Sequence, residues 1–310
     1  MQKIIPHLWF DKSVEEAVGF YTSTFQGGTV HATMHYSEVG HEIHGMDAGT
    51  VLTVEFEIEG YRLVALNGGP LFTLTPAISF MVNFDPLREP RARERLDEVW
   101  EKLSEGGRVL MPLDAYPFST RYGWVEDKYG VSWQLILTNP EGEERPVIIP
   151  SLMYVTDAGE TAESAIAFYC SVFKDARQGQ IARYPAGMEP NKEGAIMFAD
   201  FMLENQWFAA MDANAKQHTF SFNEAVSLLV LCRDQTEIDY YWEKLSAVPD
   251  AEQCGWLKDQ YGVSWQIIPH GMDEMLNDPD REKADRAMQA MLAMKKIDIA
   301  QLRAAYEGTA

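Results

Sequence analysis

The chain has 310 residues, of which 46% are hydrophobic, and a formal net charge of −21 at pH 7. This length predicts about two domains, each with enough apolar residues for its own core. The negative charge repels phosphate backbones and anionic lipids, so we expect neither nucleic-acid nor membrane binding. With no export signal and no long apolar segment in the sequence, we expect a soluble cytoplasmic protein.

The first 67 residues predict one strand, one helix and three further strands. A strand is expected over residues 4–10. Residues 13–16 have the pattern of a capping box, which predicts a helix with one apolar face that ends at Gly27 and Gly28. Three strand patterns follow, at residues 29–36, 50–59 and 61–66.

The same order of elements then returns. A strand is predicted over residues 77–83, and a helix follows with its apolar residues between 96 and 103. Gly106 and Gly107 end this helix, and three strands complete the unit. Two strand-helix-strand-strand-strand units therefore fill residues 1–140, which we predict to be a first module.

Residues 123–134, GWVEDKYGVSWQ, return as residues 255–266, GWLKDQYGVSWQ, with nine of twelve positions identical. A repeat of this quality indicates a duplicated unit. We therefore predict a second module over residues 141–270, joined to the first by a polar linker at residues 139–146. Residues 271–310 have no counterpart in the repeat. Their apolar spacing predicts a helical tail that packs on the body or on a partner subunit.

The paired units, the helix ending in A-x-x-F-Y and the closing motif V-E-D-x-x-G-x-x-x-Q at residues 125–134 resemble the vicinal oxygen chelate superfamily. This superfamily includes glyoxalases, extradiol dioxygenases and bleomycin-resistance proteins. Within it the chain resembles the PhnB-like branch, which is often labelled a demethylubiquinone methyltransferase. The resemblance implies an α+β fold in which each module forms a sheet of eight strands, curled into a cup whose concave face holds a ligand.

The resemblance also implies four positions for a divalent metal in each module, on the first, fourth, fifth and eighth strands. In this sequence they fall at His7 and Ser151, within residues 63–65 and 208–210, near Ala77 and Ala225, and at Gln134 and Gln266. Divalent cations need three or four nitrogen or oxygen donors, some of them charged. Each module offers at most two donors, with His7 and Gln134 as the candidates, so we predict no complete metal site and no cofactor.

We expect the concave faces to bind a small organic molecule. Gln134 shares a strand face with Ser132, whereas Trp133 points to the opposite side, and the repeat has the same arrangement. An amide near aromatic rings suits a small flat ligand. The predicted ligand-binding residues are His7, Trp9, Tyr122, Trp124, Gln134, Ser151, Trp256 and Gln266.

Two further features are candidates for chemistry. Glu55 and its repeat counterpart Asp200 are the candidate general bases, although acidic residues at alternate positions are also typical of a solvated sheet face. His31, His35, His41 and His44 lie within fourteen residues. They predict either a plain surface loop or a lid whose imidazoles contact the ligand.

Three hypotheses remain open beside small-molecule binding. The first is a glyoxalase-type or dioxygenase-type metal enzyme that uses His7, Gln134 and Glu55. The second is the methyltransferase of the family label, which the glycine pattern does not favour because no glycine-rich turn joins a strand to a helix. The third is a non-catalytic protein that forms a homodimer through the methionine-rich tail. Whether the protein is an enzyme stays undecided at this point.

Overall fold

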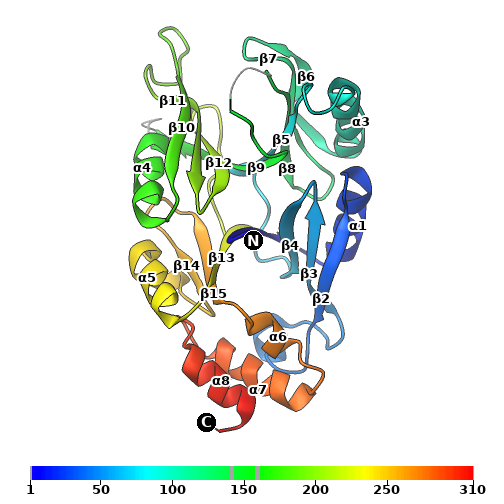
Figure 1. The fold of residues 1–310 in the computed structure, drawn as a ribbon, viewed down its shortest axis with the longest axis vertical. Coiled ribbons are helices and arrows are strands. Elements are labelled where there is room, and N and C mark those ends of the chain that lie inside the picture. The colour runs from blue at the N-terminus through cyan, green and yellow to red at the C-terminus, as the bar shows by residue number, and fades with distance from the viewer. Residues whose placement is uncertain (1, 140–142, 158–160, 310) are drawn as a thin grey trace.

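A computed structural model describes residues 2–139, 143–157 and 161–309 (Figure 1). Part of the predicted linker, residues 140–142, lies outside these ranges. Across the described residues the chain forms four consecutive units and a helical tail, which confirms the α+β fold and the repeated order of elements.

Each unit begins with a strand and a helix. Unit 1 consists of β1 (Ile4–Phe10), α1 (Val14–Thr24), β2 (Thr29–His35), β3 (Val51–Ile58) and β4 (Tyr61–Asn67), with the short helix α2 (His41–His44) between β2 and β3. Unit 2 consists of β5 (Ile78–Phe84), α3 (Ala92–Ser104), β6 (Arg108–Tyr116), β7 (Ser119–Glu126) and β8 (Ser132–Leu137). Unit 3 consists of β9 (Ile148–Thr156), α4 (Ala162–Val172), β10 (Arg177–Arg183), β11 (Ile196–Leu203) and β12 (Gln206–Asn214). Unit 4 consists of β13 (Val226–Cys232), α5 (Gln235–Leu245), the 3-10 turn η1 (Pro249–Ala251), β14 (Trp256–Lys258) and β15 (Ser264–Pro269).

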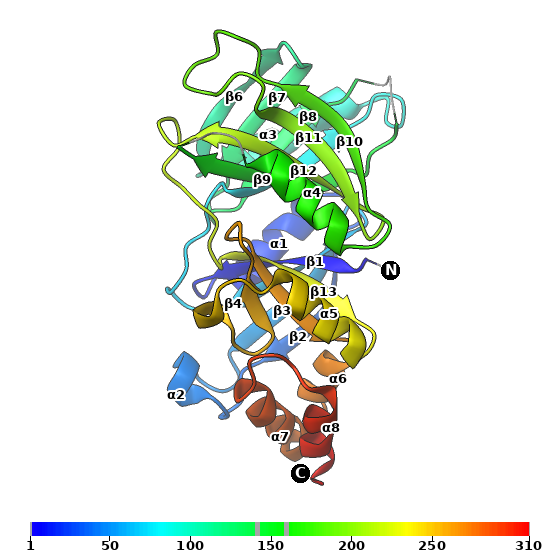
Figure 2. The ribbon, with the colours of Figure 1, turned by 90° about the vertical axis from the view of Figure 1, so that its left-hand side faces the viewer.

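The described strands form two mixed sheets. Sheet A has the order β14-β15-β13-β1-β4-β3-β2, and sheet B has the order β10-β11-β12-β9-β5-β8-β7-β6. The helices α1 and α3 cover the sheets on one side of the molecule, and α4 and α5 cover them on the other (Figure 1). Figure 2 shows sheet B above sheet A.

This pairing contradicts the expectation that each module forms its own sheet. Units 1 and 4 share sheet A because β1 pairs antiparallel with β13, and units 2 and 3 share sheet B because β5 pairs antiparallel with β9. Each module therefore contributes one unit to each sheet. The predicted boundary at residue 140 therefore separates two modules in the sequence, but it does not separate the two sheets.

The repeated motif joins the two units of one module on the helical side. Asp127 accepts hydrogen bonds from Trp133 Nε1 at 2.8 Å and from the backbone N–H of Tyr129 at 2.8 Å. Trp133 in turn packs against Tyr21 of α1, with ring centroids 5.5 Å apart. A buried carboxylate is tolerated because its oxygens are hydrogen-bonded. The motif thus acts as a packing element, with Trp133 beneath the helices as predicted.

The N-terminus of α1 is capped from a distant strand. Ser13 makes no side-chain capping hydrogen bond, so the predicted capping box is wrong. Instead, Asn67 at the end of β4 accepts a hydrogen bond from Val14 N–H at 3.2 Å. In unit 3, Asp212 plays the same part and accepts from the N–H groups of Thr161 and Ala162 at 2.6 and 2.8 Å.

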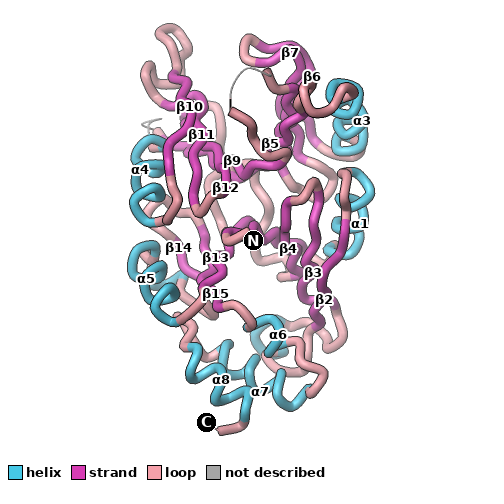
Figure 3. The backbone as a smooth tube through the Cα atoms, viewed as in Figure 1, coloured by secondary structure: helices cyan, strands magenta, loops and turns pink. Residues whose placement is uncertain are grey.

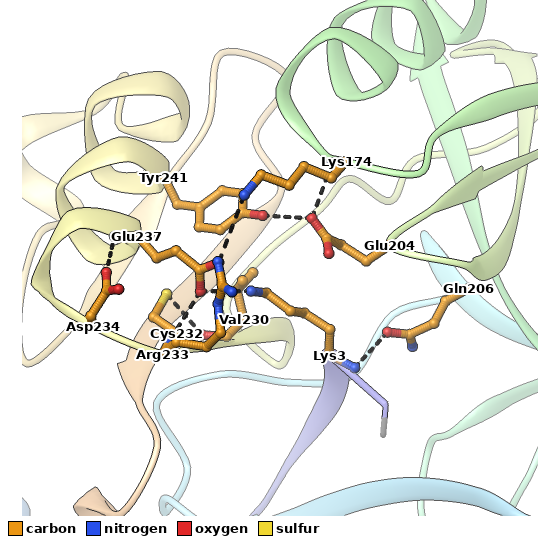
Figure 4. Close-up of polar contacts among 10 residues, drawn as sticks. All are labelled: Lys3, Lys174, Glu204, Gln206, Val230, Cys232, Arg233, Asp234, Glu237 and Tyr241. Atoms are coloured by element: carbon orange, nitrogen blue, oxygen red, sulfur yellow. Dashed lines mark hydrogen bonds and ion pairs between the residues drawn. The ribbon is translucent and has the colours of Figure 1, made fainter.

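A polar cluster joins units 1, 3 and 4 where the two sheets meet (Figure 4). Lys3 Nζ lies 2.7 Å from Glu237 Oε2 of α5. Gln206 Oε1 accepts from the N–H groups of Lys3 and Ile4 at 2.8 and 2.7 Å, so a side chain of unit 3 takes the place of a strand partner for β1. These contacts fix the start of β1 against both neighbouring units.

The tail consists of α6 (Met272–Leu276), α7 (Arg281–Leu292) and α8 (Ile299–Glu307), and it packs on the body below sheet A (Figure 3). Among the described residues, unit 4 has no strand between α5 and β14. Instead, Cys254 N–H donates to Met294 O at 2.8 Å and Gly255 N–H donates to Lys295 O at 2.7 Å, while Ile297 is fully buried. The tail therefore covers an edge that would otherwise expose unpaired backbone groups. No described helix has the length and apolar character needed to cross a bilayer.

Candidate functional site

The concave face of sheet A has a polar centre where β1, β13 and β15 lie side by side. His7 is the register partner of Ser227, and Ser227 is the register partner of Ser264. Gln266 lies on the same face of β15 and donates from Nε2 to Ser227 Oγ at 2.9 Å. The first and last units of the chain together build this centre, and neither unit contains it alone.

Two polar atoms of this centre are enclosed without a hydrogen-bond partner in the described part of the chain. They are Nε2 of the half-buried His7 and Oγ of Ser264. Burial lowers the pKa of His7 to about 3, so its imidazole is neutral at pH 7 and has one donor and one acceptor nitrogen. A buried polar atom without a partner costs free energy, and a bound molecule that hydrogen-bonds to it recovers that cost.

Trp9 and Trp256 form an aromatic wall beside this centre. Their ring centroids are 6.4 Å apart, and Phe72 lies 5.0 Å from Trp9 on the crossover from β4 to β5. The strands β1 and β14 are three positions apart in sheet A, which would separate them by about 14 Å in a flat sheet. The contact therefore reflects the curl of the sheet. Gly68 allows it, because a Cβ there would lie 2.1 Å from the Trp9 indole.

The first candidate general base lies on the same concave face but is already paired. Glu55 on β3 accepts a hydrogen bond from Arg62 Nη2 on the neighbouring strand β4. Two residues away, Glu57 Oε2 lies 3.4 Å from His31 Nε2. A carboxylate bound to a guanidinium forms an ion pair and does not present a free base. We therefore assign Glu55 to the wall of the site.

The equivalent face of sheet B contains two sets of hydrogen bonds between buried side chains. Tyr122 OH donates to Gln134 Oε1 at 2.7 Å, and Gln134 Nε2 donates to Ser79 Oγ at 2.7 Å. Trp124 Nε1 donates to Ser132 Oγ at 2.8 Å. All five side chains are less than a tenth exposed. These five side chains therefore use their polar groups on one another.

Smaller and more buried residues replace His7 and Trp9 in sheet B. Ser151 takes the position of His7, and its Oγ is enclosed without a partner among the described residues. Met153 takes the position of Trp9 and packs against Tyr122 and Trp124. The concave face of sheet B is thus filled, whereas His7, Trp9 and Trp256 of sheet A stay partly exposed.

The predicted ligand residues divide between the two faces. His7, Trp9, Trp256 and Gln266 lie on sheet A, and Tyr122, Trp124, Gln134 and Ser151 lie on sheet B. His7 and Gln134, which the metal-enzyme hypothesis combines, therefore belong to different sheets. Sequence reasoning missed Ser79 and Ser227, whereas it placed the unpaired Ser264 on the same strand face as Gln266. The repeat carried a signal for the first two, since A-I-S at residues 77–79 aligns with A-V-S at residues 225–227.

A family model described as 3-demethylubiquinone-9 3-methyltransferase matches residues 2–136 and again residues 146–268. The chain belongs to this family. The two matches fall within the two modules predicted from the repeat, and the resemblance to the PhnB-like proteins, which carry this label, is confirmed. No protein with a curated description matches the chain.

Among solved structures, a Bacillus cereus protein described as a putative 3-demethylubiquinone-9 3-methyltransferase, PhnB protein, is 38% identical over 44% of this chain and 100% of its own, with a TM-score of 0.39. A glyoxalase I mutant from Zea mays is 10% identical over 86% of this chain and 93% of its own, with a TM-score of 0.48. A mutant of the fosfomycin resistance protein FosX from Listeria monocytogenes, in complex with Mn(II) and 1S,2S-dihydroxypropylphosphonic acid, is 12% identical over 44% of this chain and 88% of its own, with a TM-score of 0.29.

The residues at the four metal positions that the resemblance implies do not fit a divalent cation. Register places His7, Val64, Ser227 and Gln266 together in sheet A, and Ser151, Ala209, Ser79 and Gln134 together in sheet B. The fifth-strand position is thus a serine, two residues beyond the predicted Ala77 and Ala225. One position in each sheet is a hydrocarbon side chain, and none is a carboxylate, which hard cations require. Among the described residues, no three His, Cys, Asp or Glu side chains group as metal ligands do.

The histidine-rich loop uses part of its imidazoles for its own folding. His44 Nδ1 accepts a hydrogen bond from Met46 N–H at 3.0 Å, and His44 Nε2 lies 3.3 Å from Val39 O. The loop rests against α7 of the tail, with a hollow of about 440 Å³ between them. These contacts give His44 a structural role in this loop. His31 instead faces Glu57 on β3.

Proposed function

We propose that the concave face of sheet A binds a small, flat organic molecule through an uncharged hydrogen-bonding group. The observation that carries this proposal is the pair of enclosed, unpartnered atoms, His7 Nε2 and Ser264 Oγ, beside the partly exposed Trp9 and Trp256. Hydroxyl, carbonyl or ring-nitrogen groups of the ligand would supply the hydrogen-bond partners that these two atoms lack. The tryptophan rings would contact its apolar faces.

The chemistry of His7 supports an uncharged partner. Its pKa is lowered to about 3 by burial, so the ring offers a neutral donor or acceptor and no positive charge. Gln266 is held by Ser227 and presents a fixed amide next to it. Pre-positioned polar groups of this kind give orientation and specificity in a mostly apolar site.

The same reasoning favours sheet A over sheet B. On sheet B, Gln134 uses both ends of its amide for Tyr122 and Ser79, and the surrounding side chains are buried. A ligand there would have to break these hydrogen bonds and displace packed residues. Of the predicted ligand residues, we therefore retain His7, Trp9, Trp256 and Gln266 for binding.

The activity named in the family description receives no support from the glycines of this chain. Cofactor-binding folds of the doubly wound type place a glycine-rich turn between a strand and the following helix. Here Gly68 and Gly69 lead from β4 into the crossover segment, and Gly106 and Gly107 lie between α3 and β6. Gly68 packs on Trp9 of the proposed site, which gives it a local steric purpose.

The proposal is tested by ligand screening with matched variants. A library of flat ring compounds bearing hydroxyl, carbonyl or ring-nitrogen groups is screened by thermal shift against the native protein. We expect at least one stabilising compound whose effect is lost in His7→Ala and Gln266→Ala and kept in Gln134→Ala. Equal losses in all three variants, or a compound insensitive to both His7→Ala and Gln266→Ala, would contradict the assignment to sheet A.

Metal analysis of the purified protein separates binding from metal-dependent chemistry. Stoichiometric zinc, nickel, manganese or iron that is lost in His7→Ala would favour the metal-enzyme hypothesis and overturn the ligand chemistry proposed above. Binding of the screened compound in the presence of a chelator, with unchanged affinity, is the result we expect.

A further inference from the structure

Arg145 reaches from the segment between the two modules onto the concave face of sheet B. Its Cζ atom lies 3.6 Å from the ring centroid of Trp207 on β12. Its Nε donates to Asp200 Oδ2 on β11 at 2.8 Å. One guanidinium therefore stacks on an aromatic ring and pairs with a carboxylate at the same time, the two contacts that favour arginine over lysine.

The two receiving residues are held in place by the sheet and not by Arg145. Asp200 Oδ1 accepts a hydrogen bond from Gln180 N–H at 2.6 Å, which fixes the carboxylate from the opposite side. Gly179 lies against both residues, since a Cβ there would be 2.0 Å from Asp200 Oδ1 and 2.9 Å from the Trp207 ring. Asp200 is 5% exposed and Trp207 is 7% exposed. Asp200 and the Trp207 ring thus form a recess in which the sheet holds Oδ1 of the carboxylate and Oδ2 accepts from Arg145.

The equivalent positions in sheet A are occupied differently from this recess. There, Glu55 takes the position of Asp200, and its guanidinium partner, Arg62, comes from the adjoining strand at the position that Trp207 occupies in sheet B. In sheet B the strand supplies an aromatic face in place of the arginine. The cation must then come from elsewhere, and the segment between the modules supplies it.

We propose that Trp207 and Asp200 form a binding site for a guanidinium group, occupied within the intact chain by Arg145. The segment 143–146 then serves as a strap that closes the concave face of sheet B. Two further ion pairs hold it, between Glu143 and Arg177 and between Glu144 and Arg88. Arg177 also lies over Trp207, with Cζ 4.7 Å from the ring centroid. The general base predicted at Asp200 is, in this assignment, the anchor of the strap.

Chemical rescue tests this proposal on the full-length protein. Arg145→Ala removes the occupant and leaves the recess, so we expect the unfolding midpoint to fall by about 5 °C, since a buried charge loses its partner. Millimolar methylguanidinium chloride should then raise the midpoint of this variant saturably and recover most of the loss. Sodium chloride and tetramethylammonium chloride at equal concentration should not, because neither can stack and pair at once.

Arg121→Ala is the matched control, because Arg121 Nε also donates to a carboxylate at 2.8 Å, that of Asp97, but the pair is more exposed. We expect no saturable rescue there. If Arg145→Ala does not fold, two other measurements replace the melting comparison. They are the refolding of Arg145→Ala with and without methylguanidinium, and the melting of the milder variant Arg145→Lys. Recovery of folded protein only with methylguanidinium supports the site. An equal response of the native protein, Arg145→Ala and Arg121→Ala to methylguanidinium would overturn it.

Discussion

His7 on β1 and Ser227 on β13 are register partners, although they belong to the first and last units of the chain. The pairing of β1 with β13 joins the strands of units 1 and 4 into the single sheet A. Ser79 and Ser151 hold the same relation in sheet B, between the second and third units. The two modules are therefore interlocked, and any site on a concave face uses residues from both.

Interlocking predicts that neither module is complete alone. Fragment 1–140 should expose one unpaired edge on each of β1 and β5. Fragment 143–310 should expose one on each of β9 and β13. We expect the two fragments to copurify as a one-to-one complex when expressed together, and each to self-associate or aggregate when expressed alone. Two stable monomers in light scattering would contradict the observed pairing of the sheets.

Two adjacent serines of sheet B should respond differently to the same change. Ser79 Oγ accepts a hydrogen bond from Gln134, whereas Ser151 Oγ has no partner among the described residues. Ser79→Ala removes the acceptor of Gln134 Nε2 and should cost about 1–3 kcal/mol in the free energy of unfolding. Ser151→Ala removes an unsatisfied hydroxyl and should be neutral or stabilising. Urea unfolding measures both, and equal destabilisation would show that Ser151 has a partner.

Glu237 should make stability depend on acid pH. Burial alone would raise its pKa, but hydrogen bonds from Arg233 and Lys3 outweigh this effect and lower the pKa to about 2 (Figure 4). Because the folded pKa lies below the unfolded value of 4.5, the carboxylate stabilises the fold above about pH 4.5. This contribution, on the order of 3 kcal/mol, is lost as the pH falls toward 2.

Glu237→Gln should therefore be less stable than the native protein at pH 7, with a difference that shrinks between pH 4.5 and pH 2. Glu163→Gln is the control, because Glu163 pairs with Arg183 in an exposed position where solvent screens the charges. Denaturant unfolding at a series of pH values checks the slope. A difference between native protein and Glu237→Gln that does not change with pH would refute the ionic role of Glu237.

Two glycines should differ in their tolerance of a methyl group. Gly179→Ala forces a Cβ against Asp200 and Trp207 and should destabilise by about 1–3 kcal/mol. Gly19 lies in the exposed face of α1 with no atom within 4 Å of an added Cβ, so Gly19→Ala should stabilise by about 0.5–1 kcal/mol. Unfolding midpoints in urea compare the two, and a neutral Gly179→Ala would show that the recess in sheet B is loose.

The tail should contribute to stability through Ile297. This side chain is fully buried, so Ile297→Ala should cost about 2–4 kcal/mol, whereas Ile43→Ala, at a position 57% exposed, should change stability by less than about 0.5 kcal/mol.

The homodimer predicted from the tail stays a prediction. Light scattering of the native protein and of Ile297→Ala measures it, and a monomer in both cases would contradict a dimer held by the tail.

The sequence by itself determined the units and the direction in which their side chains point. The repeat at residues 123–134 and 255–266 revealed the duplication, and period-two alternation placed Trp133 beneath the helices and Gln134 on the opposite face. These features follow from local patterning, which a single strand or helix carries within its own residues. They were sufficient for the fold class and for the family.

Only the tertiary structure decided which units share a sheet. Alternation specifies the face that a strand buries, but it does not specify the strand that lies at its edge, because backbone groups pair without regard to side chains. Pairing β1 with β5 or with β13 would satisfy the same pattern. The chain takes the second solution, which brings His7 to Gln266 instead of Gln134, just as Asn67 caps α1 and Arg145 reaches Asp200 from segments that no local pattern connects.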